Sequence, residues 1–521
     1  MIKRLNTTGE WIFLAMSCAL IAGVLLLNLS WTVRNSYSRD ENMFVAGAGL
    51  MSNSSMAPYR DFQFLHPPNQ ILVDSILFRF TDHYIFAGRI LSAVCAAGIA
   101  ALVLWVTKGF LDDRSKTVRY AVAWLSVLFL VANPLYVFVS GYLWDYNLAG
   151  LFAILAFCLF LKGERTSRPV IWLLASGLAL GVAIGTRLNY ITGLAPFWVL
   201  LMLYPMGNSI RGYLKWMAFF NLGLGAGLSP TITYALMAPR QFWFGNVTYH
   251  RLNTVFRSGG VFEGAIDFGE RLSYFWNHVI AQPGNLLLLL ALIFFGYLVL
   301  APQIKQSRKL DFTSSALLLS VPFIGAGAFL ASPAWYQYFY APVPFAVCAV
   351  AYGLRRASGL PDQQSARRLG VLFVLLVLLT NLYQLQEYRR VTFLRYPESW
   401  RPLQLHQLGQ QIREVIGTGK VLTLAPELVM EAGLQIYPEL ATGPFIWRVA
   451  SLVPEEERQA LDLVAPEDLE SFLAQEPPAG ILVGIEPSYE TPLLDYANQH
   501  GYHKIELTQD IAIWLPGSAG P

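Results

Sequence analysis

The sequence predicts a polytopic α-helical membrane protein with about 11 transmembrane helices, followed by a small α/β domain outside the membrane. Hydrophobic residues make up 55% and charged residues only 14% of the 521 residues, whereas a soluble domain carries about 25% charged residues. Several apolar runs also reach the roughly 20 residues that a helix needs to cross a bilayer. Both observations favour a chain that lies mainly in lipid.

The candidate spans are apolar runs separated by polar loops. They lie at 11–33, 84–107, 120–139, 147–161, 170–186, 191–204, 216–237, 284–303, 312–330, 338–354 and 369–388. The first run carries no small-residue cleavage site at its end, so we interpret it as a retained span and not as a signal peptide. The cysteines all lie inside such runs and are expected to be buried and unpaired; they are Cys18, Cys95, Cys158 and Cys348.

Lysine and arginine are distributed unequally between alternate loops. The loops that include Lys3-Arg4 and the segment 108–119 are richer in basic residues than the longer loops on the other side. Positive charge favours the cytoplasmic side of a membrane. The N-terminus is therefore expected in the cytoplasm, and loops 34–83 and 238–283 and the tail after 388 are expected to face outward.

The composition changes near residue 397. The preceding part, 1–396, is predicted to be the transmembrane module, and 397–521 a soluble extracytoplasmic domain. Short apolar runs in this tail, KVLTLAP and AGILVGI, alternate with predicted helices at 402–416 and 489–500. Alternation of short strands with helices is typical of an α/β unit.

The first outward loop contains an Asp-Glu pair ahead of an apolar helical pattern. Ser38-x-x-Glu41 matches a capping box, so Glu41 could simply cap a surface helix, with Asp40 adding favourable charge at its first turn. The alternative is that Asp40 or Glu41 is a catalytic carboxylate, for which a short helix at the membrane surface is a rigid mount.

A second polar cluster, PYRDFQFLHPPNQ, follows in the same loop. It contains Arg60, Asp61 and His66, the last directly before Pro67-Pro68. Proline suits the start of a helix, and a helix N-terminus offers unpaired N–H groups to an anion. His66 could therefore contact a phosphate, or it could be an interfacial side chain beside a turn that the prolines fix.

These loop motifs resemble the bacterial polytopic glycosyltransferases of the GT-C superfamily. Within it, the chain is similar to the protein O-mannosyltransferase and aminoarabinose transferase relatives. The resemblance rests on the outward Asp-Glu pair after the first span and on the PYRDF and HPP sequences before the second. Three further stretches support it, namely GTRLNYITGLAPF (185–197), RQFWFGNVTYHRLN (240–253) and SPAWYQYFYAPVPF (332–345).

The resemblance implies transfer of a sugar from a polyprenyl-phosphate donor, with an outward carboxylate as the base. Asp40, and alternatively Glu41, would carry that role here. The aminoarabinose relatives usually have lysine where this chain has His66, and histidine is only partly charged near neutral pH. The role of holding the donor phosphate would then pass to Arg187, Arg60 or Arg251.

Further site candidates are each weighed against a structural role. Arg187 lies next to Asn189 and Tyr190 at a span end, and we favour a donor-phosphate contact over snorkelling to the headgroups. Asp145 is expected to cap a helix. The remaining candidates for contacts to the acceptor or to a metal are Tyr249, His250, Arg251, Tyr336 and Tyr338. His250 and Arg251 could instead be ordinary loop residues. Tyr336 and Tyr338, together with Tyr340, could instead form an interfacial aromatic belt.

No Walker loop, HExxH sequence or cysteine cluster indicates a nucleotide or a built-in metal. A divalent cation held by Asp40 and His250 remains open, so the identity of any metal is unknown. The Gly-rich sequence LGLGAGLSP (222–230) is interpreted as a close helix-packing surface.

The predicted function is that of an inverting membrane glycosyltransferase. It would move a sugar from a polyprenyl phosphate to a hydroxyl of a lipid, glycan or protein acceptor at the outer face of a bacterial plasma membrane. Two alternatives remain: a transporter or flippase of lipid-linked sugars, for which charges and broken helices at mid-membrane would be expected, and a polymerase or ligase of surface polysaccharide. Nucleic acid is not an expected partner.

Overall fold

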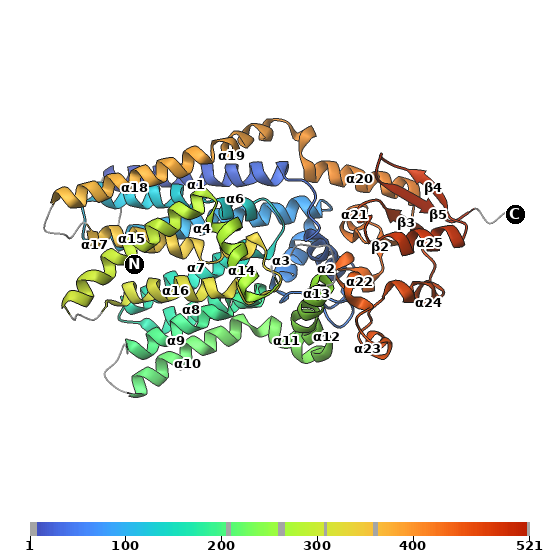
Figure 1. The fold of residues 1–521 in the computed structure, drawn as a ribbon, viewed down its shortest axis with the longest axis horizontal. Coiled ribbons are helices and arrows are strands. Elements are labelled where there is room, and N and C mark those ends of the chain that lie inside the picture. Colours follow the sequence, from blue (N-terminus) through green and yellow to red (C-terminus); the bar gives the residue numbers. More distant parts are fainter. Residues whose placement is uncertain (1–7, 205–209, 259–265, 307–309, 358–362, 518–521) are drawn as a thin grey trace.

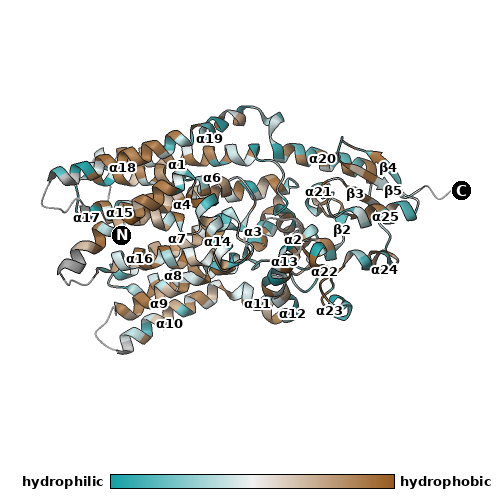
Figure 2. Ribbon diagram, viewed as in Figure 1, coloured by the Kyte–Doolittle hydropathy of each residue, from teal (hydrophilic) through white to brown (hydrophobic). Residues whose placement is uncertain are grey.

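The computed structural model describes residues 8–204, 210–258, 266–306, 310–357 and 363–517. A long helical bundle forms one part of the molecule, and a smaller α/β unit caps one of its ends (Figure 1). Hydrophobic residues dominate the bundle helices, and polar residues are more frequent in the α/β unit (Figure 2). The predicted Lys3-Arg4 segment and part of the predicted loop 238–283 lie outside the described residues.

In the described part of the chain, five helices are long and apolar enough to cross a membrane. They are α1 (Thr8–Arg34), α4 (Tyr84–Phe110), α7 (Asp145–Glu164), α8 (Pro169–Thr186) and α15 (Pro283–Gln306). A sixth span would be formed by α18 (Gln363–Tyr383) together with the segment Leu385–Arg395, which meet at a bend of 58°. The molecule is thus a multispan helical membrane protein, but the count of 11 spans is not confirmed.

Several predicted spans are shorter or broken because of proline. The predicted run 120–139 is divided at Asn133-Pro134 into α5 and α6, and the run 216–237 is divided at Ser229-Pro230 into α10 and α11. Proline lacks the N–H that would continue a helix and disfavours helical geometry in the preceding residue. The bounds are α5 (Lys116–Val131), α6 (Pro134–Val139), α9 (Leu194–Leu203), α10 (Ile210–Gly227), α11 (Ser229–Met237), α16 (Phe312–Gly327) and α17 (Val343–Ala357).

Short helices follow the first span and fill the predicted outward loops. Most of them lie where the bundle meets the α/β unit, whereas α14 lies beside the bundle helices (Figure 1). These helices are α2 (Glu41–Ser54), α3 (Asn69–Leu77), α12 (Pro239–Trp243), α13 (Tyr249–Ser258) and α14 (Phe268–Tyr274). The described parts of these two predicted loops are therefore helical for much of their length, and α3, not the second span, begins directly after Pro67-Pro68.

A five-stranded mixed sheet forms the centre of the C-terminal unit, with strand order β2-β1-β3-β5-β4. The strands β1, β2 and β3 are parallel, whereas β5 is antiparallel to both β3 and β4. The two predicted apolar runs form β1 and β3, and the two predicted helices form α20 and α25. The strands are β1 (Lys420–Leu422), β2 (Gln435–Ile436), β3 (Gly480–Val483), β4 (His503–Glu506) and β5 (Ala512–Leu515).

Helices cover this sheet and connect it to the bundle. The strand side chains Leu422, Ile481 and Leu482 are fully buried beneath them. The helices are α19 (Leu385–Arg389), α20 (Arg401–Ile416), α21 (Pro426–Glu431), α22 (Pro444–Ala450), α23 (Glu455–Ala460), α24 (Leu469–Leu473) and α25 (Thr491–Gln499). A small α/β unit is thus present as expected, while the exact boundary at 396/397 stays a prediction.

All four cysteines are unpaired, as predicted. Cys95, Cys158 and Cys348 are buried, but Cys18 is exposed on α1. The expectation of burial was wrong for Cys18 because it lies on the outer face of a helix at the edge of the bundle.

The Gly-rich stretch in α10 packs closely against α8, as expected for part of its length. A Cβ atom at Gly223 would lie 2.0 Å from the carbonyl oxygen of Leu174, and one at Gly227 would lie 2.2 Å from that of Leu178. A Cβ at Gly225 would meet no atom within 4 Å. The close approach therefore depends on alternate glycines only.

This difference predicts opposite effects of two alanine substitutions on the stability of the protein. Gly223→Ala should lower the free energy of unfolding by about 1–3 kcal/mol, because the added methyl group forces the helices apart. Gly225→Ala should be neutral or stabilising by up to about 1 kcal/mol, since alanine is the better helix former. Thermal unfolding of the detergent-solubilised proteins would measure both, and equal melting temperatures would contradict the prediction.

Candidate active site

A cavity of about 410 Å³ lies where the ends of several bundle helices meet the C-terminal unit. Its lining comes from the loop before α2, the loop before α3, the start of α7, the end of α8, and from α13 and α22. These segments are separated by up to several hundred residues in the sequence. Only the folded chain brings them together.

Asp40 lines this cavity at the residue directly before α2. Its carboxylate makes no cap hydrogen bond to the helix, so the side chain does not act as an N-cap. Burial raises the pKa of Asp40 above the ordinary range, and the nearby cations of Arg448, Arg187 and Arg39 offset part of that effect. A partly buried carboxylate with a raised pKa is a suitable acceptor for a proton.

Glu41 points away from this cavity and is held by a buried arginine. Its oxygens accept hydrogen bonds from Arg89 Nε at 2.7 Å and Nη2 at 2.6 Å, and one of them also accepts from the backbone N–H of Leu143 at 2.7 Å. Arg89 is fully buried and Glu41 nearly so. The capping-box prediction for Ser38 and Glu41 was wrong, because this ion pair directs the glutamate side chain into the bundle.

Arg187 and Asp145 form a buried ion pair at the wall of the cavity. Arg187 Nη1 lies 2.5 Å from Asp145 Oδ1, and Nη2 donates to the Tyr146 hydroxyl at 2.7 Å. The guanidinium lies over the Tyr146 ring, 3.8 Å from its centroid. Asp145 is the first residue of α7 and directs its carboxylate to Arg187, so the expectation of a simple helix cap was wrong.

The electrostatics of Arg187 follow from this pair. Burial opposes its charge, but Asp145 and the surrounding tyrosines raise the pKa of Arg187 above its ordinary value. The side chain therefore stays a cation and does not extend toward lipid headgroups. This geometry disfavours snorkelling of Arg187 to the lipid headgroups. Its contact with a donor phosphate stays a prediction.

His66 and His250 face each other across the cavity, with ring centroids 6.2 Å apart. Burial and the charge of Arg187 lower the pKa of His66 to about 3. Burial and the neighbouring His66 lower the pKa of His250 to about 4. Both rings are neutral near pH 7, so His66 cannot replace the positive charge of a lysine at this position.

Arg448 in α22 is a cavity residue that sequence reasoning missed. It is 8% exposed and its Nη2 donates to the neutral oxygens of Tyr249, at 3.1 Å, and Asn253, at 2.8 Å. In the described ranges no carboxylate pairs with it. One signal was available: a single arginine inside the apolar sequence PFIWRVA is typical of a buried, functional charge.

Arg39 and Arg257 are further cations of the cavity wall that were not predicted. Arg39 pairs with Glu486 of the C-terminal unit at 2.6 Å, and Arg257 lies over the Trp335 ring at 4.9 Å. The cavity lining thus contains four arginines against the carboxylates of Asp40 and Asp145. Its walls carry a net positive charge.

Tyr249 and Tyr338 line the cavity, while the other predicted aromatic candidates do not. Tyr336 accepts a hydrogen bond from Asn285 at 3.3 Å and packs against Phe138. Tyr340 is fully buried next to Tyr136. The expectation of an interfacial belt was wrong for Tyr340, which a short helix at Tyr336–Tyr340 buries, whereas Tyr336 and Tyr338 are half-buried.

Other predicted donor contacts are not brought to the cavity. Arg60 and Asp61 pair with each other at 2.7 Å near the surface, and Tyr190 is buried beside Gly150 inside the bundle. Arg251 is exposed and lines a neighbouring cavity of about 410 Å³. This second cavity shares His66, Arg187, His250 and Tyr338 with the first and is otherwise lined largely by apolar side chains.

No third histidine, cysteine or carboxylate side chain in the described ranges lies close enough to Asp40 and His250 to complete a metal site with them. Among the described residues, the group of histidine and carboxylate side chains close enough to hold an ion lies elsewhere, at Asp82, His83 and His406. The possibility of a metal at Asp40 and His250 stays a prediction.

Comparison with known proteins identifies the class of this fold. A profile of the family described as dolichyl-phosphate-mannose-protein mannosyltransferase matches residues 63–206. No curated protein sequence matches the chain significantly.

Solved structures match over almost the full chain. The crystal structure of ArnT from Cupriavidus metallidurans bound to undecaprenyl phosphate has a TM-score of 0.61 at 14% identity, covering 99% of this chain and 100% of that one. Its apo form has a TM-score of 0.60 at 14% identity, covering 98% and 99%. The oligosaccharyltransferase from Archaeoglobus fulgidus tethered to an acceptor peptide has a TM-score of 0.50 at 13% identity, covering 96% of this chain and 74% of that one.

The predicted resemblance to GT-C enzymes is thereby confirmed. The chain shares its fold with ArnT, and its segment 63–206 matches the mannosyltransferase family model. At these identities the structural likeness concerns the fold, and the roles of single residues rest on the geometry described above.

The different placements of Asp40 and Glu41 predict different effects on the stability of the protein. Glu41→Ala leaves the guanidinium of Arg89 buried without its anion, so the free energy of unfolding should fall by about 3–5 kcal/mol. Asp40→Asn removes no such partner and should change the free energy of unfolding by less than about 1 kcal/mol. Thermal unfolding in detergent would compare them, and a wild-type melting temperature for Glu41→Ala would contradict this account.

Proposed function

We propose that this protein is an inverting glycosyltransferase that moves a sugar from a polyprenyl phosphate to an acceptor hydroxyl at the outer face of a bacterial plasma membrane. The cavity next to Asp40 is the proposed active site. The acceptor class, whether lipid, glycan or protein, is left open by this proposal.

The observation that carries the proposal is the buried guanidinium of Arg448. A buried cation is costly unless an anion compensates it, and the hydrogen-bond partners given above for Arg448 are neutral. Arg187 adds a second buried cation, although Asp145 neutralises it. The carboxylate of Asp40 acts on Arg448 only through its field. A phosphate headgroup in the cavity would add a directly bonded anion, and a phosphate is the anion that arginine recognises best.

The chemistry follows from the arrangement of these charges. Asp40 accepts the proton of the acceptor hydroxyl, and the hydroxyl oxygen forms a bond to the anomeric carbon. The bond between that carbon and the phosphate oxygen breaks, and the phosphate retains the bonding electron pair. Stabilising the departing phosphate is expected to contribute about 3–4 kcal/mol for each well-placed donor.

The second cavity suits the start of the lipid chain of the donor. It joins the first at His66, Arg187, His250 and Tyr338 and continues past Leu188, Ile191, Val247 and Leu330. Leu188 and Ile191 are exposed side chains. Apolar side chains that lead from a cationic cavity to the outer surface of the bundle match a molecule with a charged head and an apolar tail.

The matched proteins support a donor of this chemistry. One of the two ArnT crystal structures holds bound undecaprenyl phosphate, and the matching family is that of the dolichyl-phosphate-mannose-protein mannosyltransferases. We therefore infer a single sugar carried on a polyprenyl monophosphate as the donor class.

The proposed orientation rests on the ends of α7. This helix begins at the cavity with Asp145 and ends near Lys162 and Arg165, and its 20 residues span about 30 Å, the thickness of the hydrocarbon core. Lys108, Arg114 and Arg355 lie at the same end as Lys162. Because basic residues favour the cytoplasmic side, the cavity would face outward.

The alternative of a transporter has less support from the charges. In the described ranges, the charged side chains of the cavity cluster near the helix ends that face the C-terminal unit, and α7 and α8 carry no charged residue between their terminal turns. Transporters commonly place such groups at mid-membrane. A polysaccharide polymerase or ligase remains the second candidate and would differ in the size of the transferred group.

The proposed roles predict a loss of sugar transfer in two variants. Asp40→Asn should lower kcat by roughly 10²–10⁴-fold because the general base is lost. Arg448→Gln should weaken binding of undecaprenyl phosphate and lower kcat/KM by about 100-fold or more. The assay incubates purified protein with mannosyl- or aminoarabinosyl-undecaprenyl phosphate and membrane extract, and measures released undecaprenyl phosphate by mass spectrometry.

Asp61→Asn is the matched control, since this carboxylate lies in the same loop but outside the cavity. It should keep near-normal transfer. Near-normal transfer by Asp40→Asn would overturn the role of that residue. Donor movement across vesicles without release of undecaprenyl phosphate would favour a flippase, and transfer of whole chains would favour a polymerase or ligase.

The pKa shifts in the cavity predict the pH dependence of transfer. Asp40 must be deprotonated to act as a base, and its pKa is raised by burial, so kcat/KM should fall as the pH drops through that raised pKa. His66, with a pKa of about 3, stays neutral between pH 5 and 8. His66→Gln should therefore keep the shape of the profile of kcat/KM against pH, and a new or lost limb would contradict this.

A further inference from the structure

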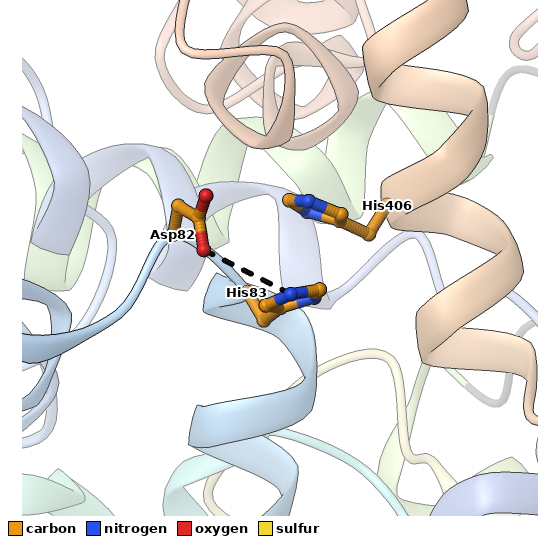
Figure 3. Close-up of side chains that lie close together, drawn as sticks. All are labelled: Asp82, His83 and His406. Carbon is orange, nitrogen blue, oxygen red and sulfur yellow. Dashed lines mark ion pairs between the residues drawn. The ribbon is translucent and has the colours of Figure 1, made fainter. Parts of the chain in front are cut away.

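Two imidazoles and a carboxylate meet outside the cavity, where α20 of the C-terminal unit lies beside the start of α4. The ligand atoms of Asp82, His83 and His406 all lie within 4.8 Å of one another. Figure 3 shows the three side chains facing a common point, with Asp82 and His83 at the start of α4 and His406 on α20. None of the three lines the cavity described above.

The two histidine rings are in direct contact. Their centroids are 3.7 Å apart, and His83 Nε2 lies 3.8 Å from Asp82 Oδ1. Within the part of the chain that the structure describes, the buried Nδ1 of His83 has no hydrogen-bond partner. A buried polar atom without a partner costs free energy, so the cluster is incomplete as it stands.

His406 is held in the orientation of a metal ligand. Its Nδ1 lies 2.6 Å from Glu431 Oε2, and the other oxygen of Glu431 accepts the backbone N–H of Ile85 at 2.6 Å. Metal-bound histidines usually donate their second ring N–H to a carboxylate in this way. The second ring nitrogen of His406, Nε2, lies 3.3 Å from the amide nitrogen of Gln410, and an ion bound at Nε2 would take the place of that hydrogen bond.

An ion can reach this site from solvent. The side chain of Asp82 is 77% exposed and that of His83 is 40% exposed, while His406 is 9% exposed at the inner side. Two imidazoles and one carboxylate form a donor set that Zn²⁺ takes, with water in the fourth position.

We propose that Asp82, His83 and His406 bind a Zn²⁺ ion that fastens α20 to the start of α4. The ion adds to the link that Glu431 already makes between α21, α20 and α4. Since the C-terminal unit supplies Arg448 to the cavity, the ion stabilises the placement of that unit on the bundle. The proposal does not depend on the proposed sugar transfer, because zinc binding is measured without a donor.

The test is a zinc titration of the full chain, purified without a histidine tag and stripped with a chelator. Competition with a chromogenic chelator should show a single tight equivalent of Zn²⁺ in the wild type. Asp82→Asn should weaken this binding by at least about tenfold, the lower end of what even an outer-shell change costs. Asp82→His supplies a nitrogen ligand in place of the carboxylate, so this variant should bind zinc more tightly than Asp82→Asn.

Asp495→Asn is the control, because Asp495 is an exposed carboxylate on α25 outside the cluster. It should bind zinc as the wild type does. Zinc should also raise the melting temperature of the wild type and of Asp495→Asn, but not of Asp82→Asn, since a ligand stabilises the state that binds it.

Three results would overturn the proposal. They are the absence of a stoichiometric zinc ion in the wild type, wild-type affinity in Asp82→Asn, and an equal loss of affinity in Asp82→Asn and Asp495→Asn. The first two would leave the histidine pair as a packing contact beside Glu431, and the third would indicate non-specific surface binding.

Discussion

The cavity depends on the buried ion pair between Arg89 and Glu41. All five N–H donors of Arg89 are used, two by Glu41 and the others by the backbone carbonyls of Thr32, Asn35 and Ser36. Glu41 in turn accepts from the backbone of Leu143. One guanidinium thus fixes the end of α1, the start of α2 and the approach to α7. Asp40 and Asp145, the two acids of the cavity, lie one and two residues from these anchored positions.

The C-terminal unit completes the cavity and is attached to the bundle by specific polar contacts. Arg39 pairs with Glu486, Gln63 donates to the carbonyl of Leu461, and Glu431 accepts from the start of α4. Exposed ion pairs contribute little to the stability of a protein. Glu486 and Glu431 are buried, so their contacts differ from such surface pairs. The C-terminal unit thereby forms one wall of the cavity through Phe445 and Arg448.

The arginines of the cavity differ in their hydrogen-bond partners. Arg187 is neutralised by Asp145, and Arg39 by Glu486, whereas Arg448 is held by neutral oxygens. In surroundings of low dielectric constant, electrostatic interactions are stronger than in water. A cation whose hydrogen bonds go to neutral groups can accept a further anion, and the phosphate headgroup of the proposed donor would be such an anion.

The sequence alone determined the properties that depend on local patterns. Apolar runs indicated the bundle, periodicity in the tail indicated α20, α25, β1 and β3, and the motifs around Asp40 and His66 indicated the GT-C class. Alternate glycines in α10 indicated its packing surface. Each of these follows from neighbours a few residues apart, so no knowledge of the tertiary structure was needed.

Only the tertiary structure decided which of the polar residues meet. Glu41 and Asp40 are adjacent in the sequence, yet Arg89 draws one into the bundle and leaves the other at the cavity. Arg448 lies more than 400 residues after Asp40 in the sequence, and His406 more than 300 after His83. Such pairs depend on burial and long-range packing, and the free energy of a charge depends on what surrounds it. The local sequence does not contain that information.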